Sequence, residues 1–222
     1  MKANTGVFNR RNDYDQIGER SFFFILGLAL IYGLGGTALI AHHFAQKAYV
    51  PDMLAIIFLG LVIPIIGIII AIKSDNPIIS FIGYNMVLIP FGIILAPILN
   101  TYSPDVIRNA FGITCVVTAT MMILSTIYPA FFSKIGGILF SALLGLVIVR
   151  VIQLFVPALG AFTFIDWISA GIFSLYIGYD WYRANEVPKT IDNAIDIAID
   201  LYLDIINLFI SILSILAKSD SD

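Results

Sequence analysis

The side chains most able to do chemistry lie in an apolar stretch near the end of the chain. Between positions 193 and 214 a polar residue recurs at every third or fourth position, which is the spacing of one face of an α-helix. This polar stripe consists of Asn193, Asp196, Asp200, Asp204, Asn207, Ser211 and Ser214. Asp204 has apolar residues on both sides, so its carboxylate is tolerable only if it faces a bundle interior, a partner or water. Asp192 and Asp196, nearer the helix start, are expected to be solvated and favoured by the helix dipole.

Other ionisable residues lie in or beside apolar segments. Asp180 closes one such segment and Arg183 follows one turn later, so an ion pair between them is geometrically allowed. Arg150 lies near the end of another segment, and its long side chain is expected to reach the membrane interface beside Asp166. Ionisable groups within the membrane are therefore the main candidates for function.

The sequence offers no constellation typical of an enzyme. It contains no Gly-x-Ser-x-Gly, His-Glu-x-x-His or phosphate-binding loop. Its histidines, His42 and His43, are adjacent and would point to different faces of a helix, which makes a poor metal site. The single Cys115 excludes a disulfide framework, and its apolar surroundings predict an inert core residue. We expect neither enzymatic activity nor a resident cofactor.

The composition is that of a membrane protein. Hydrophobic residues make up 59% of the chain and charged residues 12%, whereas soluble domains carry about 25% charged residues. Several apolar runs reach the length of a membrane-spanning helix. The net charge of -3 gives no basic surface for a nucleic acid. These features predict an all-α integral membrane protein that sits in a lipid bilayer.

Seven apolar segments are expected to be transmembrane helices. They run over residues 21–43, 53–72, 77–99, 106–127, 133–155, 162–181 and 199–217. Most connections are short and contain turn residues, so neighbouring helices are expected to be antiparallel in one bundle. The connection at 182–198 is long and polar. The prediction is one seven-helix membrane domain over residues 1–222, with a polar cytoplasmic segment at 1–20.

The distribution of Lys and Arg predicts the orientation of these helices. With the N-terminus in the cytoplasm, eight basic residues face the cytoplasm and four face the other side. The cytoplasmic set is Lys2, Arg10, Arg11, Arg20, Lys73, Lys134, Arg183 and Lys189, and the other set is Lys47, Arg108, Arg150 and Lys218. The bias favours a cytoplasmic N-terminus and an outside C-terminus.

Two C-terminal motifs resemble a known family. The first is Tyr-Ile-Gly-Tyr-Asp at 176–180, and the second is Leu-Tyr-Leu-Asp-Ile-Ile-Asn-Leu-Phe at 201–209. A weaker pattern in the fourth expected span consists of Ala110, Phe111, Thr114, Thr118, Leu124 and Ser125. Together with the seven spans, these motifs resemble the Bax inhibitor-1 family, also called the transmembrane BAX inhibitor motif family, and its prokaryotic members most of all. The resemblance covers about residues 21–216 and implies a prokaryotic plasma membrane location.

The resemblance implies a central seventh helix wrapped by the other six and the activity of a pH-sensitive calcium leak channel. The family's paired aspartates correspond to Asp180 and Asp204. Two carboxylates in a site of low dielectric constant cannot both ionise cheaply, so the pair is expected to share a proton and titrate as a unit. Because calcium prefers oxygen ligands, Asp180, Asp204 and Asn207 are expected to form a weak, transient calcium site. Calcium is then the permeant ion, protons compete with it, and protein partners stay unidentified.

The sequence does not decide which residues close such a pathway. No basic residue lies between positions 53 and 72, so Lys73 or Arg183 would have to supply a cationic latch. Asp200, Asn207 and Ser211 are further pathway candidates on the polar stripe. Two other functions remain alternatives, because membrane carboxylates also serve proton-coupled cation transporters or exchangers, and a membrane regulatory protein could act through partners.

Overall fold

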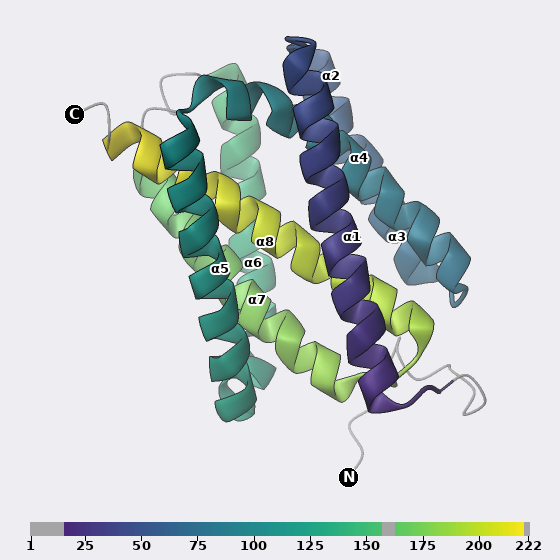
Figure 1. The fold of residues 1–222 in the computed structure, drawn as a ribbon. Helices are drawn as coiled ribbons and strands as arrows, with labels where there is room; N and C mark the ends of the chain where they lie inside the picture. The colour runs from purple at the N-terminus through teal and green to yellow at the C-terminus, as the bar shows by residue number, and fades with distance from the viewer. Residues whose placement is uncertain (1–15, 157–162, 220–222) are drawn as a thin grey trace. The chain divides into compact units, whose positions relative to one another are not determined.

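The computed structural model describes residues 16–156 and 163–219, and this part of the chain is helical without strands (Figure 1). Residues 1–15, 157–162 and 220–222 lie outside the described residues. The predictions for Lys2, Arg10 and Arg11, and parts of the predicted ranges that include these residues, therefore fall outside the described part of the chain. The helices are α1 (Glu19–Gln46), α2 (Met53–Ile57), the π-helical η2 (Phe58–Val62), α3 (Ile63–Lys73), α4 (Pro77–Thr101), α5 (Pro104–Ile127), α6 (Pro129–Phe155), α7 (Thr163–Glu186) and α8 (Ile191–Ser219). An all-helical fold is therefore confirmed.

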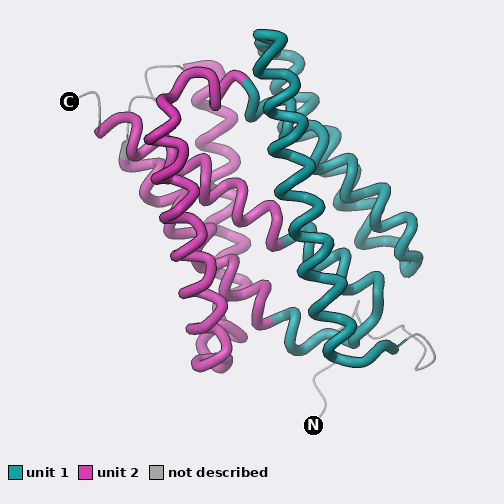
Figure 2. The backbone as a smooth tube through the Cα atoms, in the orientation of Figure 1, with its two compact units in different colours: residues 1–96, 183–200 teal, residues 97–182, 201–222 magenta. Residues whose placement is uncertain are grey.

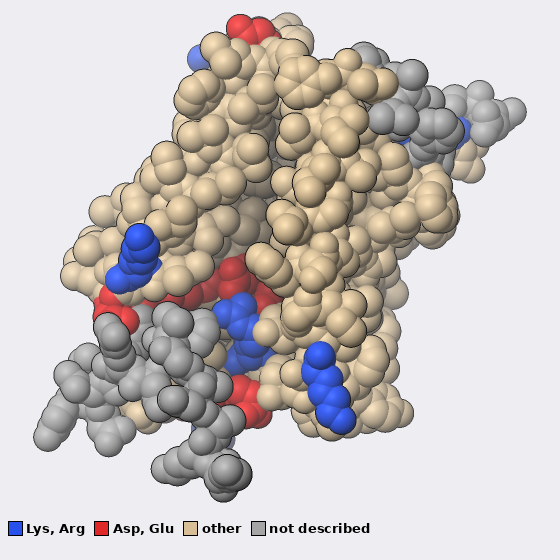
Figure 3. Space-filling view, turned by 180° about the vertical axis from the view of Figure 1, so that it is seen from behind, with Lys and Arg blue, Asp and Glu red and all other residues tan. Residues whose placement is uncertain are grey.

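Six helical stretches in the described part of the chain are long and apolar enough to cross a membrane. They comprise α1, the continuous stretch Met53–Lys73, α4, α5, α6 and α8. The helix α7 coincides with the sixth predicted span but is not among the six. Many large apolar side chains on these helices are exposed, and most of the face shown in Figure 3 carries neither acidic nor basic side chains. Such a surface is expected for helices that face lipid.

The chain forms two compact units (Figure 2). One comprises residues 1–96 and 183–200, and the other comprises residues 97–182 and 201–222. The helices α7 and α8 each contribute residues to both units. The single membrane domain over residues 1–222 stays a prediction.

Close helix packing in the first unit depends on glycines. A Cβ atom on Gly67 of α3 would lie 2.6 Å from the carbonyl oxygen of Gly83 on α4, and one on Gly92 would lie 2.7 Å from Ile40 on α1. Tyr84 donates a hydrogen bond of 3.0 Å to the Ala29 carbonyl, which also joins α4 to α1. Small residues let membrane helices approach closely enough for such contacts.

The stretch that contains α2, η2 and α3 includes a π-helical turn. Pro64 is the second residue of α3, two positions after the last residue of this turn. Proline has no N–H to donate, and its ring crowds the carbonyl of the residue four positions earlier. A wider turn before the proline accommodates both effects, and π-helical turns are frequent at functional sites.

The predicted long connection between the last two helices is much shorter than expected. Helix α7 continues to Glu186 and α8 begins at Ile191, so polar residues predicted to form a loop are helical. The Thr190 hydroxyl accepts from the backbone N–H of Asn193 at 3.1 Å. The Lys189 ammonium donates to the Ala184 and Asn185 carbonyls at 2.7 and 2.8 Å. These bonds satisfy backbone groups at the two helix ends.

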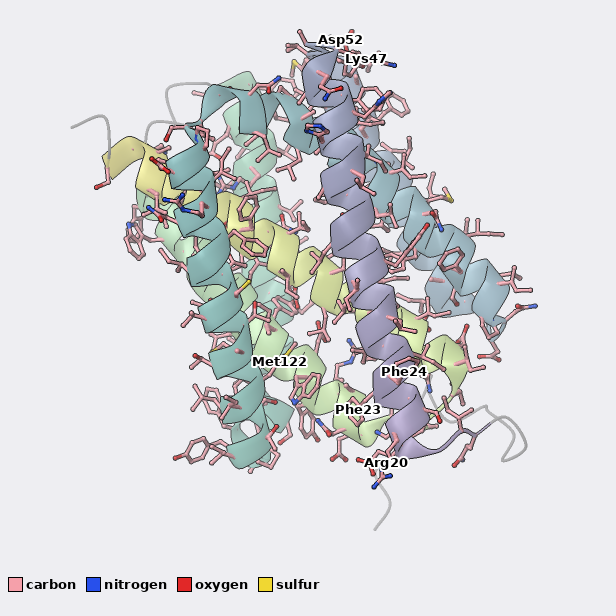
Figure 4. All side chains as sticks on the ribbon, viewed as in Figure 1. Arg20, Phe23, Phe24, Lys47, Asp52 and Met122 are labelled. Carbon is pink, nitrogen blue, oxygen red and sulfur yellow. The ribbon has the colours of Figure 1, made fainter. Side chains whose placement is uncertain are left out.

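Lys189 also lies beside aromatic side chains at the start of α1. Its ammonium lies 4.9 Å from the ring centroid of Phe22 and 5.7 Å from that of Phe23. Figure 4 shows Phe23 near Arg20 at the start of α1, and Lys47 and Asp52 at the turn beyond its other end. Burial lowers the pKa of Lys189, while the carboxylates of Glu19 and Glu186 act in the opposite direction. The start of α1 thus packs against the α7–α8 connection.

Two predictions about burial are wrong. Cys115, expected in the core, is exposed. An apolar run in a membrane protein has lipid as well as protein to face, so it does not by itself predict a core position. Asp192, expected to be solvated, is only 2% exposed, and its carboxylate accepts a hydrogen bond of 2.6 Å from Ser80. The hydroxyl of Ser80 compensates part of the loss of hydration at this carboxylate.

Candidate functional site

The paired acids predicted from the sequence are both buried. Asp180 on α7 is 3% exposed and Asp204 on α8 is 6% exposed, and both belong to the second unit. The two helices are joined farther along by a hydrogen bond of 2.7 Å between Ser169 and Ser211. Two carboxyl groups therefore lie inside one apolar helical unit, on helices that contact each other.

The register of α7 against α8 limits where these acids lie. Ser214 donates to Asp166 at 2.8 Å, and Ser169 is bonded to Ser211, so the two helices run antiparallel. Extended along both helices, this register sets Asp180 and Asp204 about one helical turn apart along the axes, or ~6 Å at 1.5 Å per residue. A direct contact between their carboxyl groups stays a prediction.

The backbone beside Asp180 is held by helix α5. Ser125 donates a hydrogen bond of 2.6 Å to the Gly178 carbonyl, and the Trp181 indole donates one of 3.1 Å to the Thr126 hydroxyl. On the other side, a Cβ atom on Gly178 would overlap the ring of Phe132 on α6. Helices α5 and α6 thus fix the turn of α7 that carries Asp180.

Gly178→Ala should destabilise the protein, because the added methyl overlaps a buried aromatic ring. Overpacking of this kind typically lowers the free energy of unfolding by about 1–3 kcal/mol. The matched control is Gly171→Ala in the same helix, where a Cβ atom meets nothing within 4 Å. The control should be neutral or slightly stabilising, since alanine favours a helix by about 1 kcal/mol over glycine. Thermal unfolding of the two purified variants measures the difference, and equal midpoints would contradict the packing described.

The latch candidates lie in different environments. Arg183 forms an ion pair with Asp200, with 2.7 Å between guanidinium nitrogen and carboxylate oxygen. Both side chains of the pair are about one quarter exposed, at 25% and 27%. Lys73 is the last residue of α3 and is exposed. Of the two predicted cations, Arg183 is the one that the structure places against a residue of the polar stripe.

The rest of the polar stripe is hydrogen-bonded along α8 and to α7. Asn207 donates from its amide to the Leu203 carbonyl at 2.8 Å. The Ser211 hydroxyl donates to the Asn207 carbonyl at 2.8 Å, so its bond to Ser169 is one in which Ser169 is the donor. The side-chain carbonyl oxygen of Asn207 is of the type that calcium accepts as a ligand. Its predicted role with Asp180 and Asp204 in a weak calcium site stays a prediction.

A second acidic centre lies in the first turn of α7. Asp166 is 3% exposed, and it receives Arg150 of α6 at 2.8 Å and Lys218 of α8 at 2.9 Å. Ser214 donates to the same carboxylate. The predicted approach of Arg150 to Asp166 is therefore confirmed. The roles of Lys218 and Ser214 were missed, although Lys218 continues the polar stripe one turn beyond Ser214.

A protein-family model described as "Inhibitor of apoptosis-promoting Bax1" matches residues 19–221. The chain belongs to the Bax inhibitor-1 family. The match includes every helix in the described part of the chain. The family resemblance inferred from the two C-terminal motifs is confirmed.

Relatives of this Bax inhibitor-1 family protein occur in bacteria and in a plant. An uncharacterized protein of Helicobacter pylori is 36% identical over 136 residues, which are 59% of this chain and 58% of that protein. An uncharacterized membrane protein of Vibrio cholerae is 28% identical over 226 residues, covering 96% of each chain. Protein LIFEGUARD 1 of Arabidopsis thaliana is 27% identical over 214 residues, covering 90% of this chain and 88% of that protein.

The aligned part of this Bax inhibitor-1 family chain spans less than two thirds of the Helicobacter pylori relatives. Its likeness to the Vibrio cholerae membrane protein and its apolar helices identify it as a multi-pass membrane protein. That part of the localisation prediction is confirmed. The plasma membrane and the orientation of the two termini stay predictions.

Proposed function

We propose that this Bax inhibitor-1 family protein is a pH-sensitive calcium leak channel. The observation that carries the proposal is the burial of two acids, Asp180 and Asp204, on contacting helices of an apolar bundle. Ionisable residues inside a membrane protein are expensive to bury and commonly mark ion or proton pathways. Their carboxylates are also the ligand type that calcium prefers.

In the proposed fold, α7 completes a set of seven membrane helices and α8 is the central one. Support comes from burial, because 56% of an 18-residue apolar stretch of α8 is buried, against 11–44% for the corresponding stretches of the other candidate spans. A helix at the centre of a bundle can carry a polar stripe, whereas a helix surrounded by lipid cannot. In the proposed orientation the N-terminus is cytoplasmic and the C-terminus is outside a prokaryotic plasma membrane.

The proposed mechanism depends on the charge of the carboxyl pair. When both carboxyls are ionised, their mutual repulsion favours a cation bound between them. When they share one proton, the repulsion is smaller and cation binding is less favoured. Protons and calcium therefore compete for the same oxygens. Each change in protonation also changes the electrostatic contacts of α7 and α8, and hence the width of the pathway beside α8. Neither step needs a resident cofactor or a covalent reaction.

The ion pair of Arg183 with Asp200 is proposed to stabilise the closed state. Asp200 precedes Asp204 by one turn on the polar stripe, and its carboxylate is bound at 2.7 Å. A cation moving along the stripe would have to compete with this guanidinium for Asp200. Arg183 is thus the better candidate for the latch than the exposed Lys73.

A proton-coupled cation exchanger is the alternative that uses the same two acids. The experiment that separates the two functions measures calcium uptake into liposomes that contain the purified protein and a pH-sensitive dye. A leak channel predicts uptake proportional to the calcium gradient, without stoichiometric proton release. Proton movement in fixed ratio to calcium would instead establish the exchanger.

A further inference from the structure

Polar contacts between α7 and α8 continue from Asp204 toward the end of α8. Ser211 is bonded to Ser169 at 2.7 Å, and Ser214 donates to Asp166 at 2.8 Å. Ser169 and Ser211 are both 2% exposed. This polar ladder, defined by the pairs Ser169–Ser211 and Asp166–Ser214, lies entirely within the second unit. It extends the polar environment of Asp204 along α8 by successive helical turns.

The ladder ends in a cluster with an excess of positive charge. Both carboxylate oxygens of Asp166 are engaged, one by Arg150 at 2.8 Å and the other by Lys218 at 2.9 Å. Two cations face a single anion, so the three side chains carry one net positive charge. The carboxylate is 4% exposed, whereas the side chains of Arg150 and Lys218 are 40% and 32% exposed. The positive charges are therefore held by a buried anion, while their own side chains are partly exposed at the end of the ladder.

We propose that Arg150 and Lys218 form a positive barrier that restricts cation passage at this end of the pathway, with Asp166 as the residue that positions them. The inference rests on the proposed calcium leak. Positive side chains and dipoles act as electrostatic barriers to cations in other membrane pores. The barrier is separate from the Asp180–Asp204 pair, because the Ser169–Ser211 contact lies between them along α7 and α8 and the barrier contains no acid of that pair.

The barrier has a consequence that depends on ion valence. The repulsion between a fixed charge and a permeating ion is proportional to the charge of the ion. A potential that reduces potassium flux by some factor therefore reduces calcium flux by about the square of that factor. Removing one positive charge should raise calcium flux more than potassium flux, whereas loosened packing would raise both fluxes by similar factors.

The test compares Lys218→Gln and Arg150→Gln with the wild-type protein in liposomes, at one pH and with equal calcium or potassium gradients. We expect each substitution to raise calcium flux about threefold to tenfold and potassium flux about twofold to threefold. Lys218→Arg keeps the charge and should retain the wild-type fluxes. Arg108→Gln is the matched control, because it removes an exposed cation of the same unit whose partner, Asp105, is also exposed.

Each outcome supports or overturns the barrier. Unchanged fluxes in both Gln variants, or equal rises for calcium and potassium, would overturn it while leaving the leak intact. An increase of calcium flux of the same size in Arg108→Gln would also overturn it, since removal of any positive surface charge would then raise the flux. A wild-type protein without calcium flux at any pH would instead overturn the leak itself, and the barrier with it. The two Gln variants are on different helices, so misfolding of one leaves the other as a test.

Discussion

Asp180→Asn and Asp204→Asn should each remove the response of calcium flux to pH in the neutral range. The reason is that a shared proton needs two carboxyl groups, and an amide cannot accept or release that proton. The double variant should add little to either single variant, because neighbouring groups that act as one unit are not additive. The measurement is calcium flux into liposomes from about pH 5 to pH 8, the range in which perturbed acids change charge.

The extent to which Asp204→Asn removes the pH response of calcium flux depends on Asp200. It lies one turn before Asp204 on the polar stripe and could replace it in part. Its carboxylate is held by Arg183 at 2.7 Å, so we expect replacement to be small while this ion pair is intact. Adding Arg183→Gln to Asp204→Asn should release Asp200 and restore part of the pH response.

The control for this prediction is Asp192→Asn, which removes another buried acid of α8. Asp192 is bonded to Ser80 and belongs to the other unit. It should retain the wild-type pH profile, which separates the loss of a sensor from the loss of any buried carboxylate. If both single variants at positions 180 and 204 also keep the wild-type profile, the pair is not the sensor.

Asp166→Asn should cause the largest loss of stability among single carboxylate substitutions in the second unit. The change leaves the charges of Arg150 and Lys218 facing each other without the anion that now bridges them. Removing one partner of a buried ion pair costs roughly 3–5 kcal/mol. Both cations here are partly exposed, so water offsets some of the loss, and we expect about 2 kcal/mol. That corresponds to a fall in the unfolding midpoint of about 4–8 °C.

Asp105→Asn is the matched control for Asp166→Asn. It breaks an ion pair of 3.0 Å with Arg108 in the same unit, but both side chains are more than three quarters exposed, at 77% and 76%. Exposed pairs contribute about 0–1 kcal/mol, so the midpoint should hardly change. Equal midpoints for the two variants would show that the three-residue cluster does not stabilise the unit.

The helical segments could be predicted because their cause is local. Apolar runs of membrane-spanning length, with turn residues such as Pro77 and Pro104 at their starts, specify where helices begin without knowledge of their neighbours. The stripe spacing likewise placed Asp204 and Ser211 on one face of a helix. The connection predicted at residues 182–198 was too long because hydropathy indicates which residues are buried in a membrane, not where a helix ends. In the structure the helix ends in this range are capped by the side chains of Lys189 and Thr190.

The candidate site was predictable only in part, since its other contacts join residues distant in sequence. Asp180 and Asp204 stand out as acids within family motifs. The hydrogen bond from Ser80 to Asp192 and the ion pair of Asp166 with Lys218 link positions 112 and 52 residues apart. No local pattern predicts such pairs, because the register of helix packing decides them. The approach of Arg150 to Asp166 was accessible from sequence because a short connection separates the two helices.

Calcium uptake into liposomes containing the wild-type protein, compared with protein-free liposomes across about pH 5 to pH 8, is the most direct test of the proposed function. We expect uptake only in the protein-containing liposomes, with a rate that follows the calcium gradient and changes across this range. Equal uptake in both preparations would contradict the calcium leak. A protein-dependent rate that is the same at every pH would contradict the pH sensor.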